Sequence, residues 1–203
     1  MDLVLASNNK NKVRELNVLL SSLGVNLIQQ GDLNIPDAEE PFITFVENAL
    51  TKAKHASRLS GKPSIADDSG LSVQCLAGAP GVLSARYAQN AGGEKSDAAN
   101  NALLLKNMQG QTNRQARFIC ALVAVRHADD PEPLIAMGRW NGVIAQTPSG
   151  SGGFGYDPLM FIPELGRAVA ELSAEEKNQY SHRAQAMKLM LDLMKTYWVD
   201  LLS

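Results

Sequence analysis

The pattern of apolar and polar positions along the chain predicts strands and helices in alternation. Short apolar runs with the length of buried strands lie at 3–6, 25–28, 63–66, 71–73 and 159–162. Two longer runs, 115–127 and 134–146, are separated by a turn through residues 129–133, so we expect them to form a hairpin. Both faces of the run at 115–127 are apolar through its middle, which places this strand inside the sheet.

Apolar residues recur at helical spacing in several further segments. These segments lie at 13–23, 45–60, 98–108 and 182–194. Thr44 and Glu47 have the spacing of a capping box, which predicts a helix that begins after Thr44 and ends near Gly61. Ser173 and Glu176 repeat this spacing and predict a short helix. Strands that alternate with helices are typical of an α/β protein.

An acidic stretch at 65–71 contains the most informative polar residues of the chain. Asp67 and Asp68 follow one short apolar run and precede another. We expect them at a strand end, where Gly70 allows the backbone to turn. Carboxylates at a strand end in an α/β protein are well positioned to hold a hard cation. The structural alternative is an Asx-type turn that satisfies its own backbone.

A polar segment between the first strand and the first helix is a candidate phosphate site. It consists of Ser7, Asn8, Asn9, Lys10, Asn11 and Lys12. Backbone N–H groups at a helix N-terminus point outward, and the helix dipole favours an anion there. The glycines of a Walker loop are missing. A helix cap with solvated lysines is the alternative.

Two more polar groups precede or follow the start of the second helix. Asp37, Glu39 and Glu40 form an acidic cluster that could supply a metal ligand or form a solvated edge. Asn48 and Lys52 lie four residues apart, so they share one helix face and could reach a site together. An exposed polar face is the alternative for this pair.

The C-terminal third contains a glycine-rich loop and a cationic helix start. The loop at 148–155 consists almost entirely of small residues, which allow a ligand to approach the backbone. Phe154 at its tip can stack on a planar base, or it can anchor the loop in the core. His182 and Arg183 begin the last helix, where positive charge opposes the helix dipole, so a ligand contact becomes more plausible there.

The composition is that of an ordinary globular protein. The 203 residues are 45% hydrophobic and 20% charged, and we expect residues 1–203 to form one domain. A formal net charge of -2 excludes a basic surface for a long nucleic acid. We expect no signal peptide and no membrane-spanning segment, since no apolar stretch approaches ~20 residues. Cys75 and Cys120 lack metal or redox spacing, which indicates reduced thiols and a cytoplasmic protein.

Four motifs together resemble the inosine triphosphate pyrophosphatase family, whose members hydrolyse non-canonical purine nucleoside triphosphates, and especially its bacterial members. In family order they are Ser7-x-Asn9-x-x-Lys12, Asp67-Asp68-Ser69-Gly70-Leu71, Gly152-Gly153-Phe154-Gly155-Tyr156-Asp157-Pro158 and Ser181-His182-Arg183. They are similar to the phosphate loop, the acidic signature, the base-binding loop and the closing motif of the family. Asn8 departs from the pattern, because many members have glycine at this position.

The resemblance implies a role for each matching residue. Asp68 would be the general base and a magnesium ligand, Glu40 would be a second metal ligand, and Asp67 would support them. The choice of Glu40 over its neighbour Glu39 rests on the resemblance. Phosphate-binding residues would be Ser7, Asn8, Asn9, Lys10, Asn11, Lys12, Lys52 and Ser69. Residues that enclose and read the purine would be Phe154, Gly155, Tyr156, Asp157, Lys177, His182 and Arg183.

The resemblance also implies a fold and an activity. The fold would be a two-lobed α/β structure with an elongated mixed sheet flanked by helices, a cleft between the lobes, and a homodimeric assembly. The enzyme would use Mg²⁺ to hydrolyse XTP, ITP and dITP to monophosphate and pyrophosphate, which prevents their incorporation into DNA and RNA. Two alternatives stay open: a non-catalytic nucleotide-sensing module, and a house-cleaning pyrophosphatase for other modified nucleotides.

Overall fold

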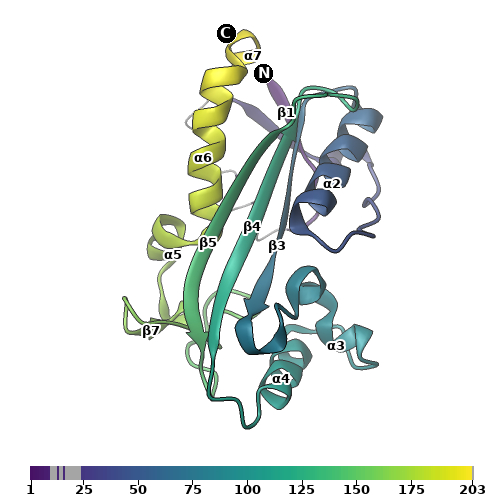
Figure 1. The fold of residues 1–203 in the computed structure, drawn as a ribbon. Helices are drawn as coiled ribbons and strands as arrows, with labels where there is room; N and C mark the ends of the chain where they lie inside the picture. The colour runs from purple at the N-terminus through teal and green to yellow at the C-terminus, as the bar shows by residue number, and fades with distance from the viewer. Residues whose placement is uncertain (10–12, 14–15, 17–23, 203) are drawn as a thin grey trace. The chain divides into compact units, whose positions relative to one another are not determined.

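The computed structural model describes residues 1–9, 13, 16 and 24–202, and these form an α/β fold around one mixed sheet (Figure 1). The described strands are β1 (Asp2–Leu5), β2 (Asn26–Gln29), β3 (Ser64–Val73), β4 (Gln115–Val125), β5 (Leu134–Ile144), β6 (Met160–Ile162) and β7 (Arg167–Ala168). Their order in the sheet is β2-β1-β3-β4-β5-β6-β7. β1 pairs in parallel with β2 and β3, whereas β6 pairs antiparallel with β5 and β7, so the sheet is mixed as predicted.

The described helices are α2 (Phe45–Ser60), α3 (Tyr87–Asn90), α4 (Asp97–Asn107), α5 (Ala174–Tyr180), α6 (His182–Tyr197) and α7 (Val199–Leu202), with 3₁₀ turns η2 (Gln30–Leu33), η3 (Gln74–Leu76), η4 (Gly81–Arg86) and η5 (Val169–Glu171). The helices α2, α4, α5 and α6 begin and end close to the positions that the sequence predicts, whereas α3 and α7 were not predicted. The Thr44 hydroxyl accepts a hydrogen bond from the Glu47 N–H, and Gly61 ends α2 with a φ of 68°. Among the described residues, no helix combines the length and hydropathy needed to cross a bilayer.

The helix predicted over 13–23 lies largely outside the described residues. Val13 and Leu16 are described, and both are buried. Their side chains belong to an apolar cluster that includes residues of β1 and α6. The apolar face predicted from their spacing is therefore confirmed at these two positions.

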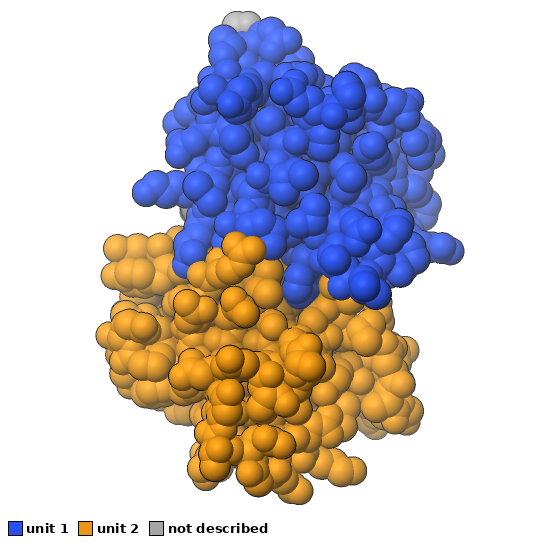
Figure 2. Space-filling model, in the orientation of Figure 1, with its two compact units in different colours: residues 1–68, 120–138, 183–203 blue, residues 69–119, 139–182 orange. Residues whose placement is uncertain are grey.

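The chain divides into two compact units, which Figure 2 shows in blue and orange. Unit 1 consists of residues 1–68, 120–138 and 183–203, and unit 2 consists of residues 69–119 and 139–182. β3, β4 and β5 each contribute residues to both units. Each unit has buried apolar residues of its own.

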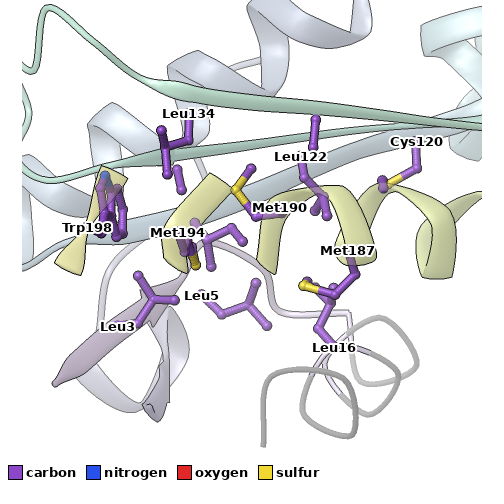
Figure 3. Packing of buried hydrophobic residues seen from close by; sticks show 14 of the residues in the cluster. Leu3, Leu5, Leu16, Cys120, Leu122, Leu134, Met187, Met190, Met194 and Trp198 are labelled. Carbon is purple, nitrogen blue, oxygen red and sulfur yellow. The ribbon is translucent and has the colours of Figure 1, made fainter. Parts of the chain in front are cut away.

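Unit 1 buries apolar side chains on both faces of its strands. Figure 3 shows one core, whose labelled members are Leu3, Leu5, Leu16, Cys120, Leu122, Leu134, Met187, Met190, Met194 and Trp198. The other core packs alanines of α2 against β1 and β4, and includes Val4, Ala49, Ala53, Ala56, Ala121 and Val123. Because successive strand residues point to opposite faces, Leu122 and Val123 enter different cores. The prediction that β4 lies inside the sheet is confirmed.

Unit 2 has a more aromatic core. Its buried members include Leu71, Val73, Leu104, Met108, Phe118, Trp140, Ile144, Tyr156, Leu159, Met160 and Val169. Leu104 and Met108 lie at and just after the C-terminal end of α4, and they pack this helix against the strands. The core therefore joins α4 to the segment that follows β5.

The acidic stretch is the main departure from the predicted secondary structure. Residues 67–70 lie within the continuous strand β3, so the expected strand end and turn are wrong. β3 lies between β1 and β4, and its burial is nearly complete. Two cations offset part of the cost of burying its carboxylates, since Arg183 faces Asp67 and Lys52 faces Asp68. Cation partners distant in sequence thus allow acids to occupy the middle of a strand.

Candidate functional site

The strand β3 directs its two adjacent carboxylates to opposite faces of the sheet, because side chains alternate along a strand. Asp67 is 1% exposed, and its Oδ2 atom lies 3.5 Å from Nη2 of Arg183. Asp68 is 6% exposed and faces α2. The strand therefore gives two chemically similar residues two different environments.

Asp68 belongs to a cluster that α2 completes from one helix face. Nζ of Lys52 lies 2.6 Å from Oε1 of Glu40 and 3.5 Å from Oδ1 of Asp68. Nδ2 of Asn48 lies 3.3 Å from Oδ2 of Asp68. Asn48 and Lys52 reach one carboxylate together, as their four-residue spacing predicts. We call Glu40, Asn48, Lys52 and Asp68 the acid–lysine cluster.

Asn48 also fixes the segment that carries Glu40. Its Oδ1 atom accepts a hydrogen bond from the Phe42 N–H at 3.0 Å, and its Nδ2 group donates to the Phe42 carbonyl at 3.1 Å. The side chain is 1% exposed. The family resemblance assigns no role to Asn48, and its position one helical turn before Lys52 is the sequence signal that indicates it.

Electrostatics keep the lysine of this cluster charged. Burial alone would lower the pKa of Lys52, but the carboxylates of Asp68, Asp67 and Glu40 outweigh this effect and raise the pKa above its ordinary value. Lys52 is thus an ammonium ion held between Glu40 and Asp68. Two carboxylates contact one ammonium here, so the cluster offers carboxylate oxygens that suit a further cation.

The donor atoms of the cluster fit a hard divalent metal. Mg²⁺ binds through one or two carboxylates and completes its shell with water and substrate phosphates. Glu40 and Asp68 could supply these carboxylates, since both lie within 3.5 Å of the same lysine nitrogen. In the described part of the chain, no three His, Cys, Asp or Glu residues group to hold a metal. The adjacent Glu39 is exposed, so the geometry favours Glu40 over Glu39.

The predicted phosphate loop is described only in its first half. Lys10, Asn11 and Lys12 lie outside the described residues. The Ser7 hydroxyl accepts a hydrogen bond from the Asn9 N–H at 3.2 Å, which shapes the loop directly after β1.

Asn8, which departs from the family pattern, has a structural partner. Its Nδ2 group donates to Oδ1 of Asp37 at 2.8 Å, and Nε2 of Gln30 donates to the same oxygen at 2.6 Å. Asp37 therefore connects the predicted phosphate loop to the segment after β2. Of the three acids that could supply a metal ligand, Asp37 thus binds a residue of this loop, whereas Glu40 belongs to the acid–lysine cluster.

A second cluster lies in unit 2, in the glycine-rich loop. Oδ2 of Asp157 accepts hydrogen bonds from Nζ of Lys177 at 2.6 Å and from the Phe154 N–H at 2.9 Å. The same ammonium lies 4.5 Å from the centroid of the half-buried Phe154 ring. A Cβ atom at Gly153 would lie 2.0 Å from Oδ2 of Asp157, so this position requires glycine. We call Phe154, Asp157 and Lys177 the aromatic–lysine cluster.

Tyr156 anchors the same loop to η4. Its side chain is 5% exposed, and its hydroxyl donates to the Ser84 carbonyl at 2.8 Å. Burial raises the pKa of the Tyr156 phenol well above its ordinary value. The hydroxyl of this predicted substrate-binding residue therefore serves the packing of the loop.

The closing motif lies in the first turn of α6, as predicted. The ring of His182 stacks on Phe118, with centroids 5.0 Å apart and 26° between the ring planes. His182 is 6% exposed and Arg183 is 2% exposed. Both side chains are thus held in defined positions, His182 by an aromatic ring of unit 2 and Arg183 by Asp67 of unit 1. Ser69, which follows Asp68 in β3, is half-buried.

Comparisons with known proteins identify the family of the chain. The model of the Ham1 family matches residues 3–193. The chain is 57% identical to the dITP/XTP pyrophosphatase of Ralstonia nicotianae, over 96% of this chain and 97% of the relative. A second dITP/XTP pyrophosphatase, from Methylibium petroleiphilum, is 56% identical over 98% of this chain and 100% of the relative.

Two solved structures have a similar fold. A HAM1 protein from Coxiella burnetii has a TM-score of 0.90 and 41% identity, covering 97% of this chain and 99% of its own. The Ham1 protein of Staphylococcus aureus has a TM-score of 0.86 and 38% identity, with the same coverage of 97% and 99%. These matches confirm the family and the α/β fold class predicted from the four motifs.

Proposed function

The chain belongs to the Ham1 family, and on this premise we propose that it hydrolyses XTP, ITP and dITP to the monophosphate and pyrophosphate. Its relatives are named dITP/XTP pyrophosphatases, which supports this choice of substrates. The observation that carries the proposal is the acid–lysine cluster. There, one charged lysine lies 2.6 Å from Glu40 and 3.5 Å from Asp68, a combination suited to a phosphate chain and its metal.

The phosphate chemistry follows from the acid–lysine cluster. Glu40 and Asp68 would hold the magnesium ion, which when bound neutralises charge on the triphosphate. Asp68 accepts a proton from the attacking water as the new P–O bond forms and pyrophosphate leaves with the electrons of the broken P–O bond. Lys52 donates to phosphate oxygens, and Asn48 keeps the Asp68 carboxylate oriented through its 3.3 Å contact. Ser7, Asn9 and Ser69 add donors for the phosphates.

Base recognition is assigned to the aromatic–lysine cluster and the closing motif. Phe154 offers a ring on which a purine stacks, and Lys177 and Asp157 hold this ring in place. Hypoxanthine and xanthine present a keto oxygen where adenine presents an amino group, so donors such as His182 and Arg183 favour them. Pairing of this kind can discriminate by roughly 10⁴.

The proposal includes three finer statements about the working enzyme. The metal is Mg²⁺, the active assembly is a homodimer, and the enzyme works in the cytoplasm. The carboxylates of the acid–lysine cluster offer oxygen ligands, which suit magnesium because it is a hard cation. Sedimentation of the purified chain gives its assembly state directly, and a monomer at working concentration would contradict the dimer.

Product analysis with ITP, XTP, GTP and ATP in the presence of magnesium tests the proposal. We expect monophosphate and pyrophosphate from ITP and XTP, and little product from GTP or ATP. Diphosphate and phosphate would mean that a different bond is cleaved. Binding without turnover would favour a nucleotide-sensing module, and turnover of pyrimidine or other modified nucleotides alone would favour a different house-cleaning activity.

A further inference from the structure

Both backbone groups of Gly155 are bound by side chains of α4, a helix that the proposed mechanism does not use. The Gly155 N–H donates to Oδ2 of Asp97 at 2.7 Å. The Gly155 carbonyl accepts from Nδ2 of Asn101 at 2.9 Å. Asp97 and Asn101 lie four residues apart, so one face of α4 presents both groups to a single residue of the glycine-rich loop, one to the peptide group on each side of it.

The helix α4 is a rigid platform for this contact. Its C-terminal half is anchored by Leu104, which is fully buried in the core of unit 2. The Asn100 side chain accepts from the Ala88 N–H at 2.8 Å, which fixes the helix to α3. Ser96 caps the N-terminus by accepting from the Ala99 N–H. Asp97 and Asn101 therefore connect the loop to a helix that the core of unit 2 holds in place.

Asn101 is chemically costly at its position. Its Oδ1 atom is buried and accepts no hydrogen bond from any residue that the structure describes. A buried acceptor without a hydrogen bond lowers stability, so an apolar side chain would suit the fold at least as well. The amide is useful only for its bond to Gly155, which indicates a role in the loop and not in the helix.

The residue that benefits is Phe154, immediately before Gly155. Its N–H is bound by Asp157, and one side of its ring faces the Lys177 ammonium. Gly155 has a φ of 63°, a conformation that needs support because glycine has many alternatives. The two bonds from α4 supply this support and fix the direction in which the Phe154 ring leaves the backbone.

We infer that Asp97 and Asn101 are positioning residues that hold Phe154 ready to stack on the purine base. This inference rests on the proposed function, because it assigns the Phe154 ring to the base. A ring that is positioned before the substrate arrives lowers the entropy cost of binding. Loss of either side chain should therefore weaken nucleotide binding and leave the chemical step intact.

Steady-state kinetics with ITP test the inference in matched variants. Asn101→Ala should raise KM about fivefold, the equivalent of one lost hydrogen bond, and change kcat by less than about twofold. Asn107→Ala is the control, since Asn107 lies on the same helix and its side chain donates to the Tyr87 hydroxyl. Asp97→Ala should raise KM similarly. Asp97→Asn keeps an acceptor oxygen for the Gly155 N–H, so its KM should stay close to the wild-type value. Asp97→Asn also removes the charge from the first helical turn, which separates the hydrogen bond from the helix dipole.

Hydrogen exchange of the nucleotide-free protein tests the contact without any catalysis. The peptide 152–157 should exchange about fivefold faster in Asn101→Ala and Asp97→Ala than in the wild type or Asn107→Ala. Thermal unfolding confirms that the variants are folded, with Tm within about 3 °C of the wild type. Unchanged exchange and unchanged KM in folded variants would overturn the inference. A wild-type protein that does not hydrolyse ITP would refute the proposed function instead, and faster exchange would still show the contact at work.

Discussion

The two lysine clusters share a salt bridge of the same length but differ in everything around it. Lys52 and Lys177 each place Nζ 2.6 Å from a carboxylate oxygen. Lys52 has a second carboxylate at 3.5 Å, that of Asp68, whereas the Lys177 ammonium lies over an aromatic ring. The first cluster therefore offers two carboxylates, and the second combines an ion pair with an apolar ring.

This difference teaches that the surroundings of an ion pair, and not the pair itself, determine its chemistry. A site with excess carboxylate oxygen attracts a metal and the phosphates that accompany it. An ion pair that packs against an aromatic ring can be buried, and it can hold that ring in position for a planar ligand. The side chains of Asp157 and Lys177 are 4% and 9% exposed, against 24% for Glu40, which leaves the first cluster more accessible to ions.

The largest effect should come from Asp68, the residue of the acid–lysine cluster assigned to the general base. Asp68→Asn keeps the shape of the side chain but cannot accept a proton from water. We expect kcat for ITP to fall about a thousandfold. Pyrophosphate release measures the loss, and the Tm shows whether the variant is folded.

The exposed Asp32 in η2 offers a matched control for this variant. Asp32→Asn makes the same chemical change in the same unit, and it should leave kcat unchanged. A folded Asp68→Asn enzyme that keeps more than about a tenth of wild-type turnover would remove Asp68 from its assigned role.

Sequence periodicity predicts the fold well because burial in this protein follows faces of strands and helices. The apolar faces of 115–127 and of α2 lie where they were expected, in two cores that sandwich the same strands. The continuity of β3 could not be predicted, since it depends on Arg183 and Lys52, which reach the acids of β3 only after folding. Local sequence preferences place adjacent acids at a strand end, but in β3 the ion pairs formed in the folded protein outweigh these preferences.

The candidate site was predictable to the extent that it consists of short motifs. The contiguous patterns at 67–71 and 152–158 indicate their residues directly, and helical spacing links Asn48 to Lys52. The distinction between Glu39 and Glu40 depends on which side chain reaches Lys52, which requires the path of an irregular segment. The contacts of Asp97 and Asn101 with Gly155 join residues more than fifty positions apart, so no local pattern predicts them.

Removal of each lysine charge should separate the two clusters kinetically. Methionine retains the apolar stem, so Lys52→Met and Lys177→Met remove mainly the ammonium. We expect Lys52→Met to lower kcat/KM about a hundredfold for every triphosphate, because it loses a phosphate donor. Lys177→Met should raise KM about tenfold and destabilise the fold by about 3 kcal/mol, since it leaves the Asp157 carboxylate buried without its cation.

A double variant separates the stability effect from the kinetic one. Asp157→Asn combined with Lys177→Met removes both charges and should recover most of the lost Tm, while KM stays high. Kinetics and thermal unfolding of all three variants provide the comparison. The same kinetic profile for Lys52→Met and Lys177→Met would show that the clusters do not differ in function.

A smaller effect should distinguish the two adjacent glutamates. Glu40→Gln removes a charge that contacts Lys52, and we expect the Mg²⁺ concentration for half-maximal activity to rise about tenfold. Glu39→Gln makes the identical change one residue earlier, on an exposed side chain, and should leave the magnesium dependence unchanged. Titration of activity with magnesium measures both. A larger shift in Glu39→Gln would reverse the assignment of the metal ligand.

The smallest effect concerns the helix that carries Lys177. The hydrogen bond from Arg167, followed by that from the Ser173 N–H, lowers the pKa of Glu176 below its ordinary value of 4.5. Because the folded pKa is depressed, the stabilisation by Glu176 is present above about pH 4.5 and is lost as pH falls through the folded value. We expect Glu176→Gln to lower the Tm by about 2 °C at pH 7, with the difference vanishing toward pH 3.

Glu175 provides the control because it is exposed in the same first turn of α5 and feels the same helix dipole. Melting curves of the wild type, Glu175→Gln and Glu176→Gln between pH 3 and 7 therefore isolate the capping hydrogen bonds from the dipole. α2, which carries Lys52, begins in a similar way, at the hydroxyl of Thr44, which accepts a hydrogen bond from the Glu47 N–H. If Glu175→Gln matched Glu176→Gln at every pH, the acid sensitivity of α5 would come from its dipole alone and not from the hydrogen bonds of Glu176.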